Sequence, residues 1–200
     1  MAAEQYDVLV IGAGQAGIAM SEHLRNLGID HIVLERKRIA ERWRSERWDS
    51  LVANGPAWHD RFPNMKFDDI DDDVFPDKER VARYFEDYAK MIEAPIRTGI
   101  EVLKVRRNER RPGFTVLTSA GVFEARHVVA ATGPFQVPSY PKIVPESSGI
   151  FQVHSSAYKN PAQLPDGAVL VVGAGASGSQ IAEELRNAGR TVYLSVGEHY

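Results

Sequence analysis

The feature that most constrains this chain is a local pattern that occurs twice along it. In the first copy, a short run over 6–11 that is rich in β-branched residues ends at a glycine turn, a segment with helical spacing follows up to Gly28, and a second apolar run covers 31–34. The second copy starts at residue 168, and its glycine turn begins 161 residues after the first. Each copy predicts a β-α-β unit, which is typical of parallel-sheet architectures.

The repeated pattern predicts an α/β fold with two Rossmann-like dinucleotide-binding units, each a three-layer arrangement around a parallel sheet. A doubly wound nucleotide domain needs further strands after its first β-α-β unit. The second copy ends at Tyr200, five residues after its second apolar run. We therefore expect the second unit to be incomplete, so that either this chain is a fragment or a partner chain completes the unit.

The first glycine turn reads GAGQAG and predicts a dinucleotide site. The first glycine of this pattern permits a tight turn, the second lets the backbone approach a pyrophosphate, and the third allows the helix to pack closely on the strand. The phosphates would lie at the helix N-terminus, where unpaired N–H groups favour negative charge. Glu35 ends the next strand, where a carboxylate can accept hydrogen bonds from ribose hydroxyls. The residues predicted to bind here are Gly12, Gly14, Gln15, Gly17, Glu35 and its neighbour Arg36.

The second glycine turn reads GAGASG in the same strand-to-helix context. Ser195, rather than an acid, stands at the end of the following strand. Without a carboxylate to repel a 2′-phosphate, this site favours NADP over NAD, and Arg190 is the basic side chain that could serve that phosphate. The residues predicted to bind here are Gly173, Gly175, Ser177 and Gly178.

Composition narrows the chemistry that two such sites can support. Two dinucleotide sites, the first with an acidic ribose anchor, imply a tightly held flavin that a nicotinamide reduces. Cysteine is absent, so the chain has no dithiol to receive electrons, and these must go to oxygen, a quinone or a small substrate.

The net charge of −3 indicates no basic surface for binding nucleic acid or anionic lipid. No apolar run approaches about 18 residues, so we expect no membrane partner and a cytoplasmic location.

The segments between the two copies differ in character. Residues 39–77 show no steady period and are interpreted as a binding loop, because a long irregular segment in a compact domain is usually functional. Apolar spacing over Lys78–Ala89 predicts an amphipathic helix. Short strands are expected at 100–105, 114–118, 122–125 and 127–131.

The stretch from 133 to 167 carries six prolines and is expected to be a linker or an extended crossover. We therefore expect an FAD-binding domain with its linker over residues 1–165, and the start of an NADP-binding domain, its first β-α-β unit only, over 166–200.

Several short segments occur in the order seen in flavin-containing monooxygenases. They are the two glycine turns and, between them, Arg42-Trp43-Arg44, Ser50 to Asn54, Phe75-Pro76, Ala131-Thr132-Gly133 and His154 to Tyr158. The whole chain resembles the N-terminal half of that class, which includes the N-hydroxylating and Baeyer-Villiger monooxygenases. The class hallmark F-x-G-x-x-x-H-x-x-x-Y/W is matched at His154 and Tyr158 but not at Ser148 and Ile150. Because the hallmark ends here in Tyr followed by Lys159, the Baeyer-Villiger subclass is the less favoured one.

The resemblance also implies roles for individual residues. Asn54 corresponds to a position where an asparagine lies near the flavin, and a side-chain amide can stabilise an oxygenated intermediate; the alternative is a loop asparagine that makes its own turn before Gly55. Val102 stands where such folds touch the FAD adenine through the backbone. The further cofactor-binding residues that the resemblance implies are Arg42, Trp43, Val102, Ala131, Thr132 and Gly133. No metal site is expected, since His59 and the acidic run 68–73 are better interpreted as a solvated loop.

The function that the resemblance implies is an FAD-dependent, NADPH-using monooxygenase. It would transfer one oxygen atom from a flavin peroxide to a soft N or S nucleophile, with a small-molecule substrate and O2 as its partners. Two alternatives stay open. The chain could be an FAD-binding module whose NADPH domain is completed by a second chain or in a homo-oligomer, or it could be an NADPH-dependent flavin oxidase or reductase.

Overall fold

The chain forms two compact units in a computed structural model that describes residues 3–109, 111–134, 137–141 and 144–197. Unit 1 comprises Met1–Ser45 and Ala53–Gln136, and unit 2 comprises Glu46–Val52 and Val137–Tyr200. The short segment 46–52 therefore belongs to unit 2, although the residues on both sides of it in the sequence belong to unit 1.

Unit 1 is built on one six-stranded sheet with the strand order β3-β2-β1-β6-β5-β4. Strand β1 pairs in parallel with β2 and with β6, and β2 pairs in parallel with β3. Strands β4, β5 and β6 form an antiparallel meander, so that β6 belongs to both parts. The strands are β1 (Glu4–Ile11), β2 (His31–Glu35), β3 (Ile96–Thr98), β4 (Val102–Arg107), β5 (Phe114–Thr118) and β6 (Gly121–Ala130).

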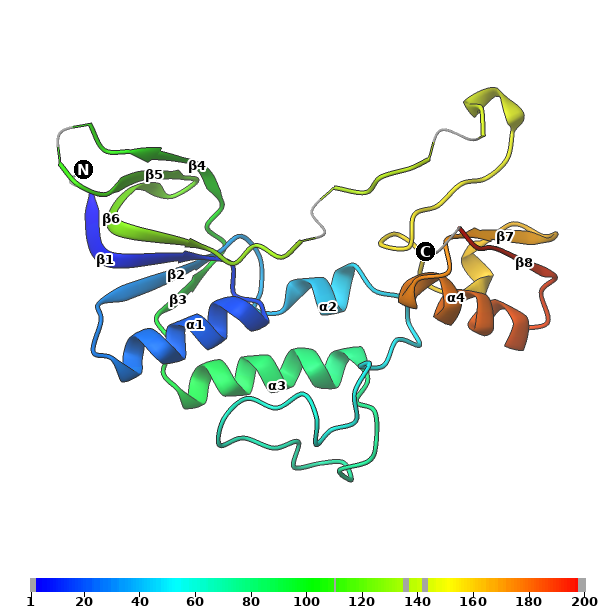
Figure 1. The fold of residues 1–200 in the computed structure, drawn as a ribbon, viewed down its shortest axis with the longest axis horizontal. Coiled ribbons are helices and arrows are strands. Elements are labelled where there is room, and N and C mark those ends of the chain that lie inside the picture. The colour runs from blue at the N-terminus through cyan, green and yellow to red at the C-terminus, as the bar shows by residue number, and fades with distance from the viewer. Residues whose placement is uncertain (1–2, 110, 135–136, 142–143, 198–200) are drawn as a thin grey trace. The chain divides into compact units, whose positions relative to one another are not determined.

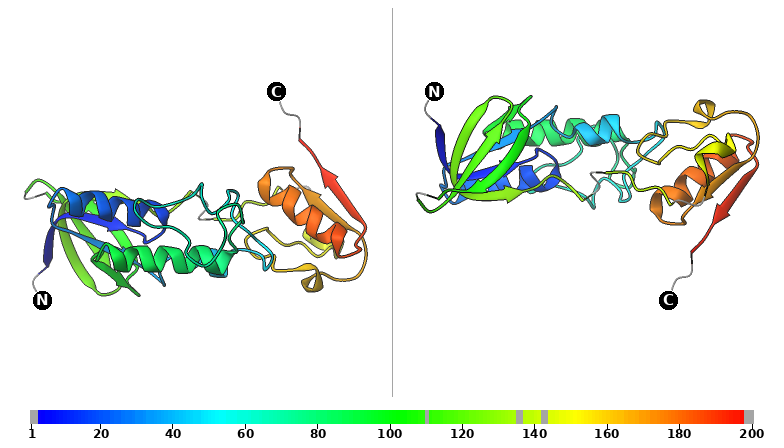
Figure 2. Two further views of the ribbon diagram at one scale, coloured as in Figure 1. Left: turned by 90° about the horizontal axis from the view of Figure 1, so that it is seen from below. Right: turned by 90° about the horizontal axis from the view of Figure 1, so that it is seen from above.

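The helices of unit 1 cover one face of the parallel strands, and the meander covers the other (Figures 1 and 2). These helices are α1 (Gln15–Asn26), the short α2 (Glu41–Ser45) and α3 (Lys78–Met91). Helices α1 and α3 run side by side, and α2 packs on α3. The three-layer α/β architecture predicted from the sequence is confirmed in unit 1.

Alternation along β1 explains why the second half of this strand, residues 8–11, is apolar at every position. Successive side chains of a strand point to opposite faces of the sheet. Leu9 therefore packs toward the meander, against Val116 and Phe123, whereas Val8 and Val10 pack toward α1. A strand covered on both faces needs apolar residues at every position, which is what residues 8–11 of β1 show.

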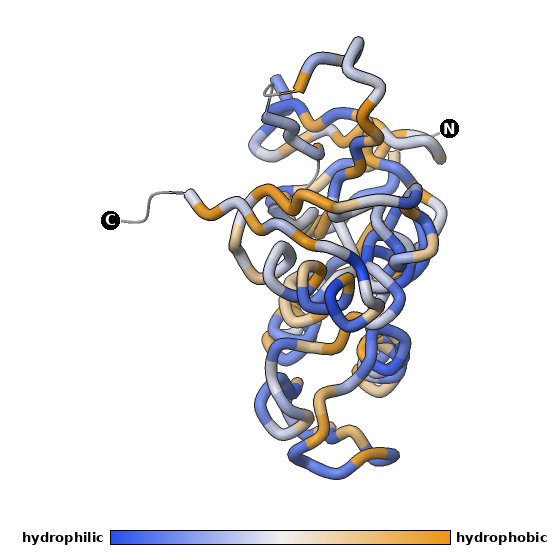
Figure 3. The backbone as a smooth tube through the Cα atoms, turned by 90° about the vertical axis from the view of Figure 1, so that its right-hand side faces the viewer, coloured by the Kyte–Doolittle hydropathy of each residue, from blue (hydrophilic) through white to orange (hydrophobic). Residues whose placement is uncertain are grey.

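Unit 2 contains the second β-α-β unit, which confirms the repeat. Strands β7 (Val169–Val172) and β8 (Val192–Ser195) pair in parallel, and α4 (Ala176–Asn187) connects them. Two short 3-10 helices, η1 (Glu146–Ser148) and η2 (Pro161–Gln163), precede β7. In Figure 3, hydrophobic residues, in orange, recur along β8, the strand nearest to the C label. Within the described ranges, every helix is too short or too polar to cross a membrane.

Three elements differ from the sequence-based expectation. Strand β3 was not predicted, because its three residues are too few to show a period; its pairing with β2 defines it. The two strands expected at 122–125 and 127–131 are one strand, β6. The charged Arg126 interrupts the apolar pattern where β6 leaves its partner β5 and continues beside β1. Finally, α2 interrupts the expected irregular segment 39–77.

We predict that Leu9→Ala costs about 2–5 kcal/mol of unfolding free energy, because Leu9 is 0% exposed between two layers and its truncation leaves a cavity. The matched control is Leu27→Ala, since Leu27 is 73% exposed and its loss should cost less than about 0.5 kcal/mol. Urea denaturation followed by circular dichroism measures both. Equal losses in the two variants would contradict the three-layer packing.

Candidate functional site

The first glycine turn brings three backbone segments into close approach. Gly12, at φ +103°, follows β1, and its N–H donates to the carbonyl of Leu34 at 2.8 Å. A Cβ on Gly12 would lie 2.6 Å from the carbonyl oxygen of Ala131, and a Cβ on Gly17 would lie 1.9 Å from the carbonyl oxygen of Gly12. Real side chains do not tolerate such distances, so the turn can form only with glycine at both positions.

Gly14, at the N-terminus of α1, has free space around it, unlike Gly12 and Gly17. A Cβ there would meet nothing within 4 Å, so the backbone faces open space. No side chain caps this helix end, and its first turn carries no acidic residue. The first N–H groups of a helix have no intrahelical acceptor and carry the positive end of the helix dipole. These groups, including that of Gln15, form a cradle that fits the pyrophosphate of a dinucleotide.

Glu35 is held beside this cradle at the C-terminal end of β2. Its Oε2 accepts a hydrogen bond from the Ala13 N–H at 2.9 Å, and its Oε1 accepts one from the Lys37 N–H at 2.8 Å. An ionised carboxylate has about four acceptor positions, so these two bonds leave capacity for ribose hydroxyls. Arg36, the next residue, is exposed. Since the bonds to Ala13 and Lys37 set the orientation of Glu35, the residue is ready to accept from a ligand at the glycine turn.

The end of β6 completes this edge of the sheet. The Ala131 N–H donates to the carbonyl of Ile11 at 2.9 Å, which places Ala131 against the first glycine turn. Thr132 and Gly133 follow, and Gly133 has a φ of +81°. The carboxyl ends of β1, β2 and β6 therefore meet at one edge, which is where open α/β sheets bind ligands.

Val102 reaches the same neighbourhood from the meander. It begins β4, pairs with Thr118 and packs against the apolar cluster that contains Leu34. Two residues earlier, the N–H of Ile100 donates to the carbonyl of Glu35 at 3.0 Å. The chain that enters β4 thus passes directly beside the end of β2.

Asn54 lies on a backbone ribbon within the predicted binding loop. The Ala53 N–H donates to the carbonyl of Pro76, and the Ala57 N–H donates to that of Val74, both at 2.8 Å. Ala53 and Ala57 are buried, whereas Asn54 is exposed. The loop has a defined conformation because its backbone pairs with itself, and this pairing sets the position of Asn54.

Aromatic contacts fasten the same loop to α3. The ring of Phe62 stacks on that of Tyr88 with centroids 4.2 Å apart, and the Phe62 N–H donates to the Tyr84 hydroxyl at 2.8 Å. Burial raises the pKa of Tyr84, so its hydroxyl stays protonated and donates in turn to the carbonyl of Met65 at 3.0 Å. The loop has no hydrophobic period, so its sequence does not indicate which residues anchor it.

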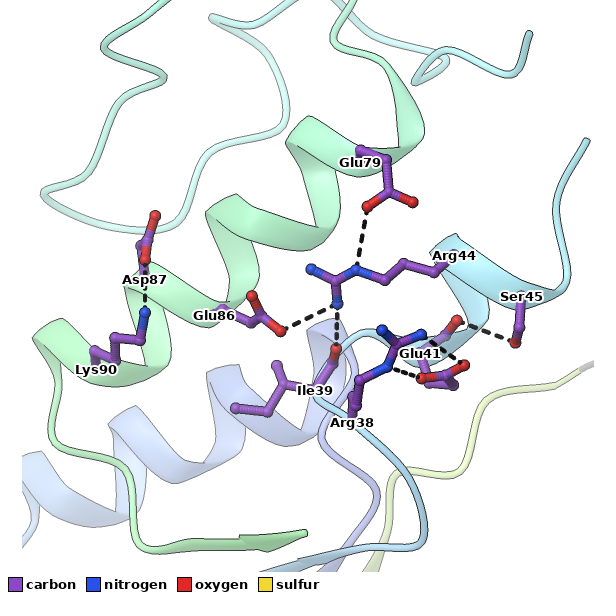
Figure 4. Close-up of polar contacts among 9 residues, drawn as sticks. All are labelled: Arg38, Ile39, Glu41, Arg44, Ser45, Glu79, Glu86, Asp87 and Lys90. Carbon is purple, nitrogen blue, oxygen red and sulfur yellow. Dashed lines mark hydrogen bonds and ion pairs between the residues drawn. The ribbon is translucent and has the colours of Figure 1, made fainter. Parts of the chain in front are cut away.

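The side chain of Arg44 attaches helix α2 to α3 (Figure 4). Arg44 donates to Glu79 at 3.2 Å, to Glu86 at 3.1 Å and to the carbonyl of Ile39 at 3.1 Å. The two carboxylates stand seven residues apart on one face of α3, a spacing that the sequence itself shows. The Arg44 guanidinium is thus engaged in holding α2, while the neighbouring Arg42 is half-buried.

Trp43 and Glu41 support this attachment. The Trp43 ring meets the Phe85 ring edge-on with centroids 6.4 Å apart, so Trp43 packs on the core of unit 1. The Arg38 guanidinium donates to Glu41 at 2.7 Å and holds the pKa of that carboxyl below its usual range. Glu41 therefore remains ionised at the start of α2, where a negative charge stabilises the helix.

The second glycine turn reproduces the geometry of the first. Gly173 has a φ of +99°, and its N–H donates to the carbonyl of Ser195 at 3.0 Å. A Cβ on Gly178 would lie 1.9 Å from the carbonyl oxygen of Gly173, whereas a Cβ on Gly175 would meet nothing within 4 Å. The first turn of α4 has no acidic residue, and Ser177 there is exposed. This cradle also fits a phosphate group.

The strand register identifies the residue of the second unit that corresponds to Glu35. Ser195 pairs and bonds as Leu34 does in the first unit, so Val196, not Ser195, takes the position of Glu35. Neither Ser195 nor Val196 supplies a carboxylate. Arg190 donates to the carbonyl of Gly167 at 3.0 Å, and also to that of Pro165, at the start of β7. Its guanidinium is therefore engaged at the end of the strand opposite to the glycine turn.

His59 lies beside Asp60, and the nearby Asp72 and Asp69 pair with Arg61 and Arg80. His59 Nδ1 lies 2.9 Å from Asp60 Oδ1. Among the residues that the structure describes, no group of three or more His, Asp or Glu side chains is placed to hold a metal ion.

Comparison with known proteins identifies the family of this chain. The model of the family described as pyridine nucleotide-disulphide oxidoreductase matches residues 9–199. An uncharacterised CzcO-like oxidoreductase of Geobacillus kaustophilus is 47% identical over 96% of this chain and 54% of its own length. A probable indole-3-pyruvate monooxygenase of Arabidopsis thaliana, YUCCA4, is 30% identical over 88% of this chain and 43% of its own length.

A solved structure of a flavin-containing monooxygenase from Stenotrophomonas maltophilia superposes with a TM-score of 0.85 at 26% identity, covering 98% of this chain and 59% of that one. The resemblance to flavin-containing monooxygenases is thus confirmed. The chain spans about half the length of the curated relatives it matches. On the match over residues 9–199, the chain belongs to the pyridine nucleotide-disulphide oxidoreductase family.

Proposed function

We propose that this chain is the FAD-binding domain and the start of the NADP-binding domain of a flavin-dependent monooxygenase. The observation that carries the proposal is the pair of glycine turns with one geometry, of which only the first has a carboxylate beside it among the residues that the structure describes. A carboxylate suits the ribose hydroxyls of FAD, and its absence from the second turn suits NADP. The division into residues 1–165 and 166–200 is part of this proposal.

The net reaction that we propose consumes NADPH, a proton, O2 and a soft N or S nucleophile, and it yields NADP+, water and the oxygenated product. When bound, FAD supplies the redox chemistry that joins the two-electron donor to O2. The family takes its name from disulphide reduction, but this chain contains no cysteine, so it supplies no dithiol for that reaction.

The chain's own residues bind and orient the cofactor. The N–H groups that follow Gly14 would hold the pyrophosphate, and Glu35 would accept from the ribose. The small residues after β6, from Ala131 to Gly133, leave room for a ligand to pass close to the backbone. The Asn54 amide can both donate and accept, so it can hydrogen-bond a reacting oxygen without placing a full charge there.

We expect Gly14→Val to abolish FAD binding while leaving the fold intact. The added side chain would enter the open space where the pyrophosphate would lie. The backbone at position 14 is extended, a conformation that valine readily adopts. The matched comparison is Gly17→Ala, whose Cβ would collide with the Gly12 carbonyl and lower the melting temperature even without ligand. Melting curves and visible absorbance at 450 nm after FAD reconstitution separate the two effects. Normal FAD occupancy in Gly14→Val would refute the assignment of the site.

We expect the purified chain to show a flavin spectrum, recorded anaerobically before and after addition of NADPH. Bleaching would show that the nicotinamide site is functional, and the next measurement is sulfoxide formation from a thioether in the presence of O2. A flavin that stays oxidised would favour the module hypothesis, in which further chain completes the NADPH domain. Peroxide released in equal amount to the NADPH consumed, with or without thioether, would favour an oxidase over the monooxygenase that we propose.

A cytoplasmic location and association with a second chain or in a homo-oligomer stay predictions. Fractionation and sedimentation of the holoprotein test them.

A further inference from the structure

His59 and Asp60 lie against the residue that follows Asn54 in the chain. His59 Nδ1 is 2.9 Å from Asp60 Oδ1. A Cβ placed on Gly55 would come 3.0 Å from His59 Nδ1 and 2.9 Å from Asp60 Oδ2, so both side chains touch the Gly55 backbone. Gly55 is buried, whereas the two side chains are exposed. The imidazole–carboxylate pair therefore lies between Gly55 and solvent, one residue along the chain from Asn54.

Backbone bonds and a ring contact fix the position of the imidazole. The His59 N–H donates to the Pro56 carbonyl at 2.8 Å and closes a turn over residues 56–59. The Trp58 ring meets the imidazole edge-on, with centroids 5.5 Å apart. After the pair, the Arg61 guanidinium donates back to the Ala57 carbonyl at 2.7 Å. The imidazole thus has a defined position, although its side chain is 60% exposed.

The partner of Nδ1 decides which ring nitrogen of His59 carries the proton. An ionised carboxylate only accepts hydrogen bonds, so in the neutral imidazole Nδ1 is protonated and Nε2 holds a lone pair. None of the residues that the structure describes bonds to His59 Nε2. Because an imidazole takes up and releases protons near neutral pH, Nε2 is available for proton transfer to a ligand or from water.

The net reaction proposed above consumes a proton that the Asn54 amide does not supply. A side-chain amide donates hydrogen bonds without ionising, so it can hold a reacting oxygen but does not protonate it. An imidazole in the same loop has the chemistry that the amide lacks. Asn54 and His59 therefore have complementary properties.

We propose that His59, oriented by Asp60, is the proton donor for the oxygen atom that Asn54 holds. In the transfer, the Nε2–H bond of the imidazolium breaks and an O–H bond forms on the oxygen atom that leaves as water. The imidazole then takes a replacement proton from solvent, and no electrons pass to or from His59. This role rests on the function proposed above, whereas the arrangement of the pair is a property of the chain without ligand.

Nitrogen-15 NMR of the histidine side chains tests the arrangement in the ligand-free chain, at a pH where imidazoles are neutral. We expect His59 to carry its proton on Nδ1, with its signals assigned by their loss in His59→Gln. Asp60→Ala should give a mixture of the two tautomers, since the partner of Nδ1 is removed. Gly55→Ala should do the same, because its Cβ displaces the ends of the two side chains while Gly55 has no positive φ that alanine would strain. His23, exposed on α1, is the internal reference whose signals should not change.

The role of His59 is tested on the FAD-reconstituted chain, with the flavin reduced by dithionite so that no nicotinamide site is needed. After mixing with O2 and a thioether, His59→Ala should slow the return of the oxidised flavin spectrum by about 100-fold, a typical effect of losing a general acid. Free imidazole should raise the rate of this variant at least about tenfold, because it can supply the missing proton. His23→Ala is the matched control and should react like the unchanged chain.

Three results would overturn the inference. A proton on Nε2 of neutral His59 would show that Asp60 does not orient the ring. An unchanged rate in FAD-loaded His59→Ala would show that another group donates the proton, and a slow rate that free imidazole does not raise would show a structural role only. If the unchanged chain binds no FAD, the proposed function itself is refuted and the role of His59 with it, whichever tautomer the NMR detects.

Discussion

The close approach of backbone to backbone at Gly12 is the constraint on which unit 1 depends. The ends of β1 and β6 and the first turn of α1 meet there at distances that exclude a Cβ. Because no side chain intervenes, the helix starts directly at the strand end, and its N–H groups open onto the same edge as Glu35. Because Gly12 and Gly17 have no side chains, the backbone segments of the turn can pack closely. Because Gly14 has none, space for a ligand remains beside the helix N-terminus. The packing of the turn and the open space beside it thus depend on different glycines of one motif.

The two glycine turns show how little local sequence decides about burial. Leu9 and Leu170 occupy equivalent positions in runs that read VLVI and VLVV, yet Leu9 is 0% exposed and Leu170 is 57% exposed. The meander covers Leu9, and nothing in the described part of unit 2 covers Leu170. Likewise a Cβ on Gly12 would meet Ala131, whereas one on Gly173 would meet no atom within 4 Å. The conformation of the turn is therefore local, and its surroundings come from the rest of the sheet.

A polar network in unit 2 joins segment 46–52 and the linker to α4. Ser50 comes from between two parts of unit 1, Tyr158 from the linker, and Glu184 from the helix that follows the second turn. Arg44 acts in a comparable way in unit 1, where it joins α2 to two carboxylates of α3. In both places a charged group with several bonding positions orders a segment that has no hydrophobic period of its own.

Local chemistry made much of this protein predictable from its sequence. Both glycine turns, their flanking strands and helices, and the amphipathic α3 follow from strand and helix periodicity and from the special backbone needs of glycine. Strand β3, the continuity of β6 past Arg126, the anchoring of the loop around Asn54, and the meeting of Ser50 and Tyr158 at Glu184 were decided only by the tertiary structure. The physical reason is that each of these depends on partners distant in the sequence, whose hydrogen bonds leave no period in the chain that makes them.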